Sequence, residues 1–152
     1  MIREAVSEDA SLLARLLRDA FEEYRGRLEP PSSAHGKTEE VVRRELHDGG
    51  ALIAESPAGP EGCVFFHPRG DHVYLDRLAV LPPYRGRGVA RALMEAVEAR
   101  ARDMGPLPVR LNVRLALKDH QEWYARQGYA FLRHGTHEGH AAPTYVVLEK
   151  RF

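Results

Sequence analysis

The residues with the clearest chemical meaning form one short turn, Arg85-Gly86-Arg87-Gly88, between an apolar stretch and a long amphipathic stretch. Glycines let a ligand approach the backbone closely, and the arginines supply positive charge around it. If a helix begins after this turn, its first N–H groups lack internal partners and its macrodipole makes that end partly positive. The pattern therefore predicts a cradle for a phosphate or diphosphate group.

Three phosphate-binding motifs compete for this turn. A P-loop requires a Lys followed by Ser or Thr after its last glycine, and neither follows Gly88. A dinucleotide fingerprint starting at Gly86 would need a third glycine where Arg91 stands, and it usually follows the first strand. The pattern R-x-x-G-x-A fits Arg85, Gly88 and Ala90. An ordinary solvated turn is the structural alternative.

The elements that must position this turn follow from hydrophobic spacing. Helical periodicity predicts a helix over residues 8–24 with Ser7 as its N-cap, and a second helix that Thr38 caps. The overall order is β-α-α-β-β-β-α-β-α-β-β, in which residues 73–115 form a right-handed parallel crossover. The remaining helices are expected at residues 90–103 and 119–127, and the strands at 2–6, 51–56, 63–68, 72–80, 108–115, 129–134 and 144–150.

The bulk composition limits the function classes. A chain of 152 residues fits a single domain over residues 1–152. Lys plus Arg and Asp plus Glu both total 22, which argues against nucleic-acid or membrane partners because those need a basic excess. The single cysteine, Cys63, indicates a reducing compartment, and no run approaches 18 apolar residues. We therefore expect a cytoplasmic protein.

With these elements in place, the chain resembles the GCN5-related N-acetyltransferases, the GNAT family. The family's strand ending L-x-V is matched by Leu78-Ala79-Val80, and its [QR]-x-x-G-x-[GA] turn by Arg85–Ala90. Its later Y-x-x-x-G-[FY] pattern is matched by Tyr124, Gly128 and Tyr129. The resemblance implies an α/β (mixed α+β) fold with a mostly antiparallel, twisted sheet of about seven strands. It also implies one parallel, splayed strand pair and four flanking helices.

The resemblance further implies acetyl-coenzyme A as the cosubstrate. Its pyrophosphate would lie on the N–H groups of the turn, and its pantetheine arm would run along the strand that ends at Val80. The N–H near Val80 would polarise the thioester carbonyl as an oxyanion donor does. The implied cofactor-binding residues are Leu78, Ala79, Val80, Arg85, Gly86, Arg87, Gly88, Val89, Ala90, Arg91 and Asn112.

The catalytic residues are less well determined by the sequence. Tyr124 occupies the family position of the proton donor to the departing thiolate, although a helical tyrosine there can also simply pack. Asp76 shares the strand parity of Leu78 and Val80 and is the candidate base, with a structural carboxylate as the alternative. Asn112 lies where some relatives carry a glutamate base, but an amide cannot accept the proton.

Some positions depart from the family pattern or leave alternatives open. Leu117 stands where many relatives have an asparagine that contacts pantetheine. The histidines His134, His137 and His140 lie in one loop. They fit a polar mobile loop better than a zinc site, so we expect no metal, although one of them is a further candidate for base or acceptor contact.

The resulting hypothesis is an N-acetyltransferase that moves an acetyl group from acetyl-CoA to a primary amine by direct attack in a ternary complex. The alternative is a non-catalytic acyl-CoA-binding or sensor domain of the same fold. The resemblance implies that the acceptor, a small molecule or a protein amine, binds between the first two helices, their loop at residues 25–37 and the last two strands, where the motifs are silent. Relatives often dimerise, but the sequence leaves homodimer formation open.

Overall fold

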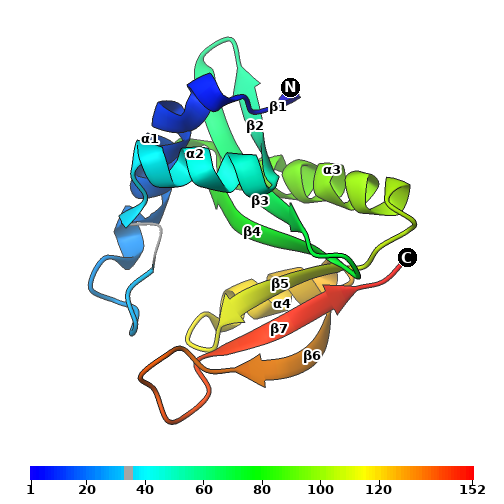
Figure 1. Ribbon diagram of the computed structural model, residues 1–152. Helices are drawn as coiled ribbons and strands as arrows, with labels where there is room; N and C mark the ends of the chain where they lie inside the picture. Colours follow the sequence, from blue (N-terminus) through cyan, green and yellow to red (C-terminus); the bar gives the residue numbers. More distant parts are fainter. Residues whose placement is uncertain (33–35) are drawn as a thin grey trace. The chain divides into compact units, whose positions relative to one another are not determined.

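The structure is a computed structural model that describes residues 1–32 and 36–152. Part of the loop expected near the acceptor, at Ser33, Ala34 and His35, lies outside the described residues. The elements follow each other in the order expected from the sequence (Figure 1). No helix in the described part of the chain is both long and apolar enough to cross a membrane.

Within the described residues, the α-helices and strands agree with the expected positions to within a few residues. Short 3-10 turns, η1 and η2, flank the first helix at Ser7–Asp9 and Glu22–Tyr24, and η4 lies at Pro82–Tyr84. The α-helices are α1 (Ala10–Phe21), α2 (Glu39–Asp48), α3 (Val89–Asp103) and α4 (Lys118–Arg126). The strands are β1 (Ile2–Glu4), β2 (Gly50–Ser56), β3 (Gly59–Pro68), β4 (Val73–Val80), β5 (Val109–Arg114), β6 (Ala130–Gly135) and β7 (Tyr145–Lys150).

The strands hydrogen-bond as one 7-stranded sheet in the order β1-β2-β3-β4-β5-β7-β6. β1 with β2, β2 with β3, β5 with β7, and β6 with β7 pair antiparallel. β4 and β5 pair parallel, and their register covers Val73 opposite Val109 and Tyr74 opposite Arg110. The predicted mixed sheet with one parallel strand pair is therefore confirmed.

The chain divides into two compact units, which we describe separately. The first unit contains Met1–His67 and Leu75–Ala99, and the second contains Pro68–Tyr74 and Arg100–Phe152. β4 and α3 each contribute residues to both units. The turn singled out by the sequence belongs to the first unit, whereas Tyr124 and Asn112 belong to the second.

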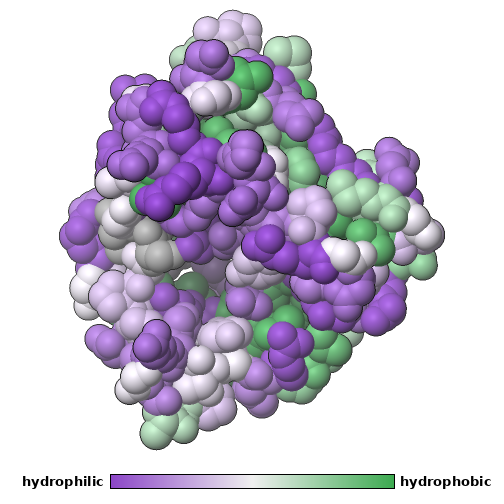
Figure 2. All heavy atoms as spheres, viewed as in Figure 1, coloured by the Kyte–Doolittle hydropathy of each residue, from purple (hydrophilic) through white to green (hydrophobic). Residues whose placement is uncertain are grey.

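The core of the first unit forms where α1 and α2 pack on one face of the sheet. Leu13 and Leu17 of α1 and Val42 of α2 are fully buried in one cluster with Ile53 and Phe65. Alternate strand residues reach this cluster because successive side chains of a strand point to opposite faces. The outer face of α2 is exposed, and Figure 2 shows mainly hydrophilic side chains over it.

The two predicted N-caps have different outcomes. The Thr38 hydroxyl accepts a hydrogen bond from the Val41 N–H at 3.2 Å, which confirms the cap of α2. The Ser7 prediction is wrong, because Ser7 lies inside η1 and no side-chain cap bond forms at the residue before it. Instead, the Asp9 carboxylate accepts from the Val6 N–H at 2.8 Å.

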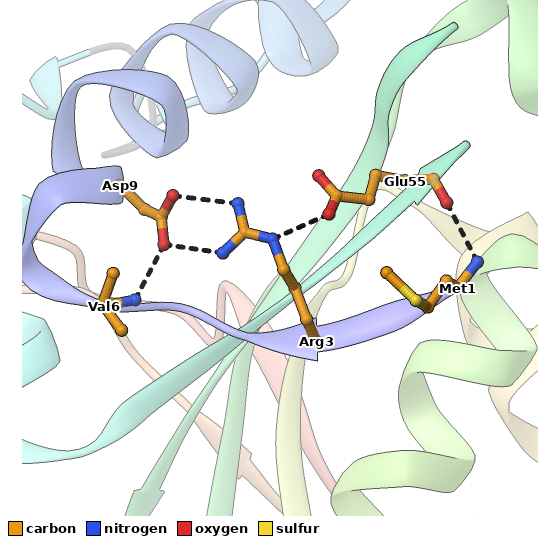
Figure 3. A network of polar contacts seen from close by, with 5 residues as sticks. All are labelled: Met1, Arg3, Val6, Asp9 and Glu55. Carbon is orange, nitrogen blue, oxygen red and sulfur yellow. Dashed lines mark hydrogen bonds and ion pairs between the residues drawn. The ribbon is translucent and has the colours of Figure 1, made fainter. Parts of the chain in front are cut away.

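The physical reason for this change is an ion-pair network around Arg3 (Figure 3). The Arg3 guanidinium donates to both Asp9 carboxylate oxygens at 2.8 and 2.9 Å and to Glu55 Oε1 at 2.8 Å. The Arg3 hydrogen bond, opposed by desolvation, lowers the pKa of Asp9. Asp9 is therefore held by β1 and is well placed to cap the turn in place of Ser7.

The second unit is built on the antiparallel strands β5, β7 and β6, which α4 accompanies. Leu111 and Val113 of β5 and Val146–Leu148 of β7 are buried, whereas nearly all of β6 is exposed. Near the C-terminal end of β7, the Glu149 carboxylate accepts hydrogen bonds from Arg110 and Arg151, both at 2.7 Å. Burial opposes ionisation of Glu149, but the two arginines outweigh it and lower the pKa of the carboxyl.

Candidate functional site

The turn between β4 and α3 has the backbone expected of a phosphate cradle. Gly86 and Gly88 adopt φ values of +76° and +82°, in the left-handed region that favours glycine. A Cβ at either position would meet no heavy atom within 4 Å, so these glycines serve the backbone conformation and leave its outer side open. Among the described residues, no atom therefore stands within 4 Å of these two positions on that side of the backbone.

The start of α3 supplies the donors. The Ala92 N–H donates to the Gly88 carbonyl at 3.0 Å, which is the first turn of this helix. The N–H groups of Val89, Ala90 and Arg91 precede that bond, and such groups have no acceptor within their own helix. Together with the positive end of the macrodipole, they form an arrangement suited to an anion.

The two arginines of the turn and Arg91 of α3 are not equivalent. Arg85 forms an ion pair with Glu23 and also donates to two backbone carbonyls. Arg91 pairs with Glu95 one helical turn later at 3.0 Å, with both side chains largely exposed. The Arg87 guanidinium carbon lies 5.8 Å from the centroid of the Tyr84 ring. Of these three arginines, Arg85 has the most partners within the protein and is therefore the least available to an anion.

The strand before the turn contains an irregularity that sequence reasoning missed. Arg77 in β4 has φ +52°, which is uncommon for a residue with a side chain. Its guanidinium pairs with the Asp76 carboxylate at 2.8 Å, and the Asp76 side chain is only 14% exposed. Simple alternation does not extend across a left-handed residue, so the parity argument for Asp76 as a base is weakened, and its role stays a prediction.

A glycine in the neighbouring strand fixes the approach of β4. A Cβ at Gly62 of β3 would lie 2.6 Å from the Ala79 carbonyl oxygen and 3.3 Å from the Val80 Cα. Only a residue without a side chain fits this contact. The sequence pattern predicts that this strand begins at residue 63, whereas β3 begins at Gly59, so Gly62 is a strand residue that this prediction left in the preceding turn.

In the second unit, Tyr124 lies near the end of α4. Its ring contacts the Trp123 and Tyr129 rings edge-on, with centroid distances of 5.1 and 6.1 Å. The helix ends after it, and Gly128 follows with φ +96° while the Tyr129 N–H donates to the Tyr124 carbonyl at 3.1 Å. The Y-x-x-x-G-Y pattern thus places a half-buried tyrosine in an aromatic cluster.

Asn112 occupies the middle of β5 and pairs with Val147 of β7. It is exposed between two buried neighbours, so it faces away from the β5–β7 core.

Leu117, one of the departures from the family pattern, is the N-cap residue of α4 and forms no side-chain cap bond. Gln121, which sequence reasoning missed, joins α4 to β5 by donating to the Arg114 and Leu115 carbonyls at 3.0 and 3.1 Å.

His134 is a strand residue, since it lies in β6 and pairs with Val146, so only His137 and His140 belong to the loop that follows. This loop between β6 and β7 is more ordered than a free polar loop. The His137 N–H donates to the Thr144 hydroxyl at 2.9 Å, and the His137 ring lies 5.0 Å from the Tyr145 ring, centroid to centroid. Burial, with Arg114 and His140 nearby, lowers the pKa of His137. Among the residues described, no group of three or more His, Cys, Asp or Glu side chains is placed to hold a metal ion.

The lone cysteine lies in the core. Cys63 is fully buried in the same cluster as α1, and burial raises the pKa of its thiol to about 12. A thiol with this pKa is almost entirely protonated at neutral pH and is a poor nucleophile. Cys63 is therefore a small residue of the core.

A mixed sheet with one parallel strand pair, followed by a glycine-arginine turn that opens a helix, is the arrangement of an acyltransferase fold. A sequence model of the acetyltransferase (GNAT) family matches residues 12–129, and the chain belongs to this family. Acetyl-CoA is the acyl donor that this family uses.

Among individual relatives, an uncharacterised N-acetyltransferase of Mycobacterium tuberculosis is 44% identical over 63 residues. The match spans only 40% of this chain and 40% of that relative's length. A thialysine N-epsilon-acetyltransferase of Bos taurus is 30% identical over 130 residues, which cover 74% of each chain.

Solved structures show the same fold. The PaiA N-acetyltransferase of Thermoplasma acidophilum, in complex with coenzyme A, superposes with a TM-score of 0.82 at 20% identity and covers 100% of this chain and 98% of its own. A GCN5-related N-acetyltransferase of Rhodopseudomonas palustris gives a TM-score of 0.80 at 22% identity, covering 100% and 95%.

Proposed function

We propose that this protein is an acetyl-CoA-dependent N-acetyltransferase that acts on a primary amine. The observation that carries the proposal is the left-handed glycine turn at the start of α3 in a chain of this family. In the proposal, the N–H groups from residue 86 to residue 90 bind the diphosphate of acetyl-CoA, since the Arg85 N–H already donates to the Pro82 carbonyl at 3.3 Å. Arg87 and Arg91 add charge at the edge of the diphosphate.

The chemistry requires the amine in its neutral form. A lysine-like amine with a pKa of about 10.4 is neutral in only about one molecule in 2,500 at pH 7, a deficit of roughly 4.6 kcal/mol. A base must therefore remove a proton before or during attack. We assign this role to Asp76, directly or through water, with His137 as the alternative because its lowered pKa favours the neutral imidazole.

The attack itself needs a polarised carbonyl and a protonated leaving group. In the proposal, the Val80 N–H donates to the thioester oxygen as negative charge develops there. The amine nitrogen forms the new bond to the acetyl carbon, the carbon–sulfur bond breaks, and Tyr124 gives its proton to the departing thiolate. The surplus proton on the new amide nitrogen leaves to solvent, and Tyr124 regains a proton from solvent. By analogy with cysteine, whose thiol has a pKa of about 8.5, the proton transfer to the thiolate needs only modest assistance.

The name of the bovine relative supports a side-chain amine as the first acceptor to test. The assay follows CoA release with a thiol reagent in the presence of acetyl-CoA and thialysine, lysine or a peptide N-terminus. Because Cys63 is buried with a pKa of about 12, the protein's own thiol contributes little background at neutral pH. Turnover with any amine supports the proposal.

Calorimetry with CoA separates the remaining outcomes. Binding of CoA without turnover on any amine would favour the sensor function, to which the Leu117 departure also points. Absence of CoA binding would refute both functions. An Arg87→Ala variant should bind CoA about tenfold more weakly or worse if it loses one charge-assisted hydrogen bond. Arg15→Ala, at an exposed position of α1, is the control.

A further inference from the structure

Arg85, the first arginine of the turn, is engaged by three segments of the chain at once. Its Nε donates to the Val80 carbonyl at 2.9 Å, and its Nη2 donates to the Ala20 carbonyl at 3.0 Å. Its Nη1 forms an ion pair with Glu23 Oε1 at 2.5 Å. The Arg85 and Glu23 side chains are 40% and 43% exposed, so this ion pair is partly shielded from water.

These contacts connect the end of α1 to the end of β4. Ala20 lies in the last turn of α1, where helix carbonyls lack internal partners, and Glu23 lies in η2 directly after it. A guanidinium at a helix C-terminus satisfies such carbonyls and is favoured by the macrodipole. Arg85 therefore caps α1 from a position 65 residues later in the chain.

The contact with Val80 fixes a peptide plane. The carbonyl of the Val80–Leu81 peptide accepts from Arg85, and the N–H of the same peptide donates to the Glu61 carbonyl of β3 at 2.9 Å. Both polar atoms of this peptide thus have defined partners. The Val80 N–H lies in the preceding peptide, whose Ala79 carbonyl oxygen is packed so closely on Gly62 that a Cβ there would lie 2.6 Å from it. Both peptides that flank the Val80 Cα are therefore held, and in the planar Ala79–Val80 peptide the N–H points opposite to that carbonyl.

We propose that Arg85 is a positioning residue, which orients the Val80 N–H toward the thioester carbonyl, rather than a ligand of the diphosphate. This inference rests on the proposed acetyltransferase function and goes beyond it, since it assigns the arginines of the turn to different tasks. In this assignment the Arg87 guanidinium, which lies over the Tyr84 ring, binds the diphosphate. Arg85 acts on the carbonyl of the acyl group through the orientation of the Val80 N–H.

Diphosphate binding and orientation of the Val80 N–H predict different rate changes when the acyl donor is varied. Acetyl-pantetheine carries the thioester but lacks the diphosphate of acetyl-CoA. A residue that binds the diphosphate affects reactions of acetyl-CoA alone, whereas a residue that orients the Val80 N–H affects both donors alike. Product CoA has no thioester carbonyl, so its affinity should not depend on that orientation.

The experiment compares Arg85→Lys and Glu23→Gln with Arg87→Ala and with the parent. Lysine keeps the charge but lacks the planar fork that reaches three acceptors. We expect Arg85→Lys to lower kcat about 10- to 100-fold with both acyl donors, as a displaced oxyanion donor does. Calorimetry should find its Kd for CoA within about twofold of the parent value, with unchanged stoichiometry, which shows that the protein is folded.

The other variants sharpen the comparison. Glu23→Gln keeps a neutral acceptor and should have a smaller effect in the same direction, again equal for both donors. Arg87→Ala should weaken acetyl-CoA and CoA while sparing acetyl-pantetheine. Arg43→Lys and Glu39→Gln alter an exposed Arg–Glu pair on α2 and should match the parent.

Two results would overturn the inference: an Arg85→Lys loss confined to acetyl-CoA with weaker CoA binding, or unchanged kcat with both donors. A parent protein that neither binds CoA nor turns over would instead refute the proposed function. The parent measurements therefore distinguish the two failures.

Discussion

Replacing Gly88 by alanine tests the backbone of the turn directly. Gly88 has φ +82°, and a Cβ there would meet no protein atom within 4 Å. The substitution therefore adds no clash and removes no side-chain contact. The substitution raises the free-energy cost of the left-handed conformation. It also adds a methyl group on the open side of the backbone, where the proposal places the diphosphate.

The magnitude follows from these two effects. An L-residue in the left-handed region costs about 1–2 kcal/mol relative to glycine. If the alanine variant keeps the conformation, its new methyl group stands on the side from which the anion approaches. If the turn relaxes, CoA binding must restore the strained conformation, and an energy of about 1–2 kcal/mol corresponds to a roughly 5- to 30-fold loss of affinity. Both routes weaken CoA binding.

The matched control is Gly70→Ala, in the turn between β3 and β4. Gly70 has φ +87°, and a Cβ at this position would also meet nothing within 4 Å, so its conformational cost is the same. If the strain is retained, either variant should lower Tm by about 2–8 °C for a chain of this size. Calorimetry with CoA should then show weaker binding for Gly88→Ala alone. Parent-like affinity in Gly88→Ala would refute the role of this turn in diphosphate binding.

Three further predictions concern other parts of the chain. Tyr124→Phe should lower kcat about 100-fold, the lower end of general acid catalysis, while calorimetry shows an unchanged Kd for CoA; an unchanged rate would remove this tyrosine from the mechanism. Gly62→Ala should lower the free energy of unfolding by about 1–3 kcal/mol in a denaturant titration, because its Cβ would overlap the Ala79 carbonyl oxygen of β4. Gly36→Ala is the control, since a Cβ there meets nothing within 4 Å. Asp9→Asn should be about 1–3 kcal/mol less stable than the parent at pH 7, because the Arg3 hydrogen bond lowers the pKa of Asp9 in the folded state. That contribution is present above the unfolded carboxyl pKa and is lost as the pH falls through the folded value, so unfolding curves of the two proteins that fail to converge in acid would contradict it.

Local features of the site were predictable from the sequence, and long-range ones were not. The Gly86 and Gly88 conformations follow from the residue types and from the helix that begins next to them. The engagement of Arg85 by Glu23 depends on the packing of α1 near the end of β4, which no short motif records. The left-handed Arg77 has no sequence signal either, because such conformations usually select glycine, asparagine or aspartate.

The fold shows the same distinction. Alternation and helical periodicity predicted the element order because they reflect burial of one face, and α1 indeed buries Leu13, Leu16 and Leu17 at helical spacing. The cap at Ser7 failed because a third residue, Arg3, holds Asp9 in place to accept the Val6 N–H. A cap preference is worth about 1 kcal/mol, which a part-buried network of charge-assisted hydrogen bonds readily exceeds.

The charge of the turn is smaller than its sequence indicates, and this has a consequence for ligand binding. Arg85 is offset by Glu23, and Arg91 by Glu95, so the two ion pairs leave Arg87 with most of the uncompensated positive charge of the turn. An anion held mainly by backbone N–H groups and one arginine should depend on salt less steeply than one held by three arginines, because fewer mobile charges are exchanged. Binding of CoA should therefore depend more on the conformation of the two glycines than on the number of arginines. Comparing the salt dependence of CoA affinity in the parent and in Arg87→Ala would measure this balance, and a steep dependence that survives in the variant would mean that the two ion pairs open when the ligand binds.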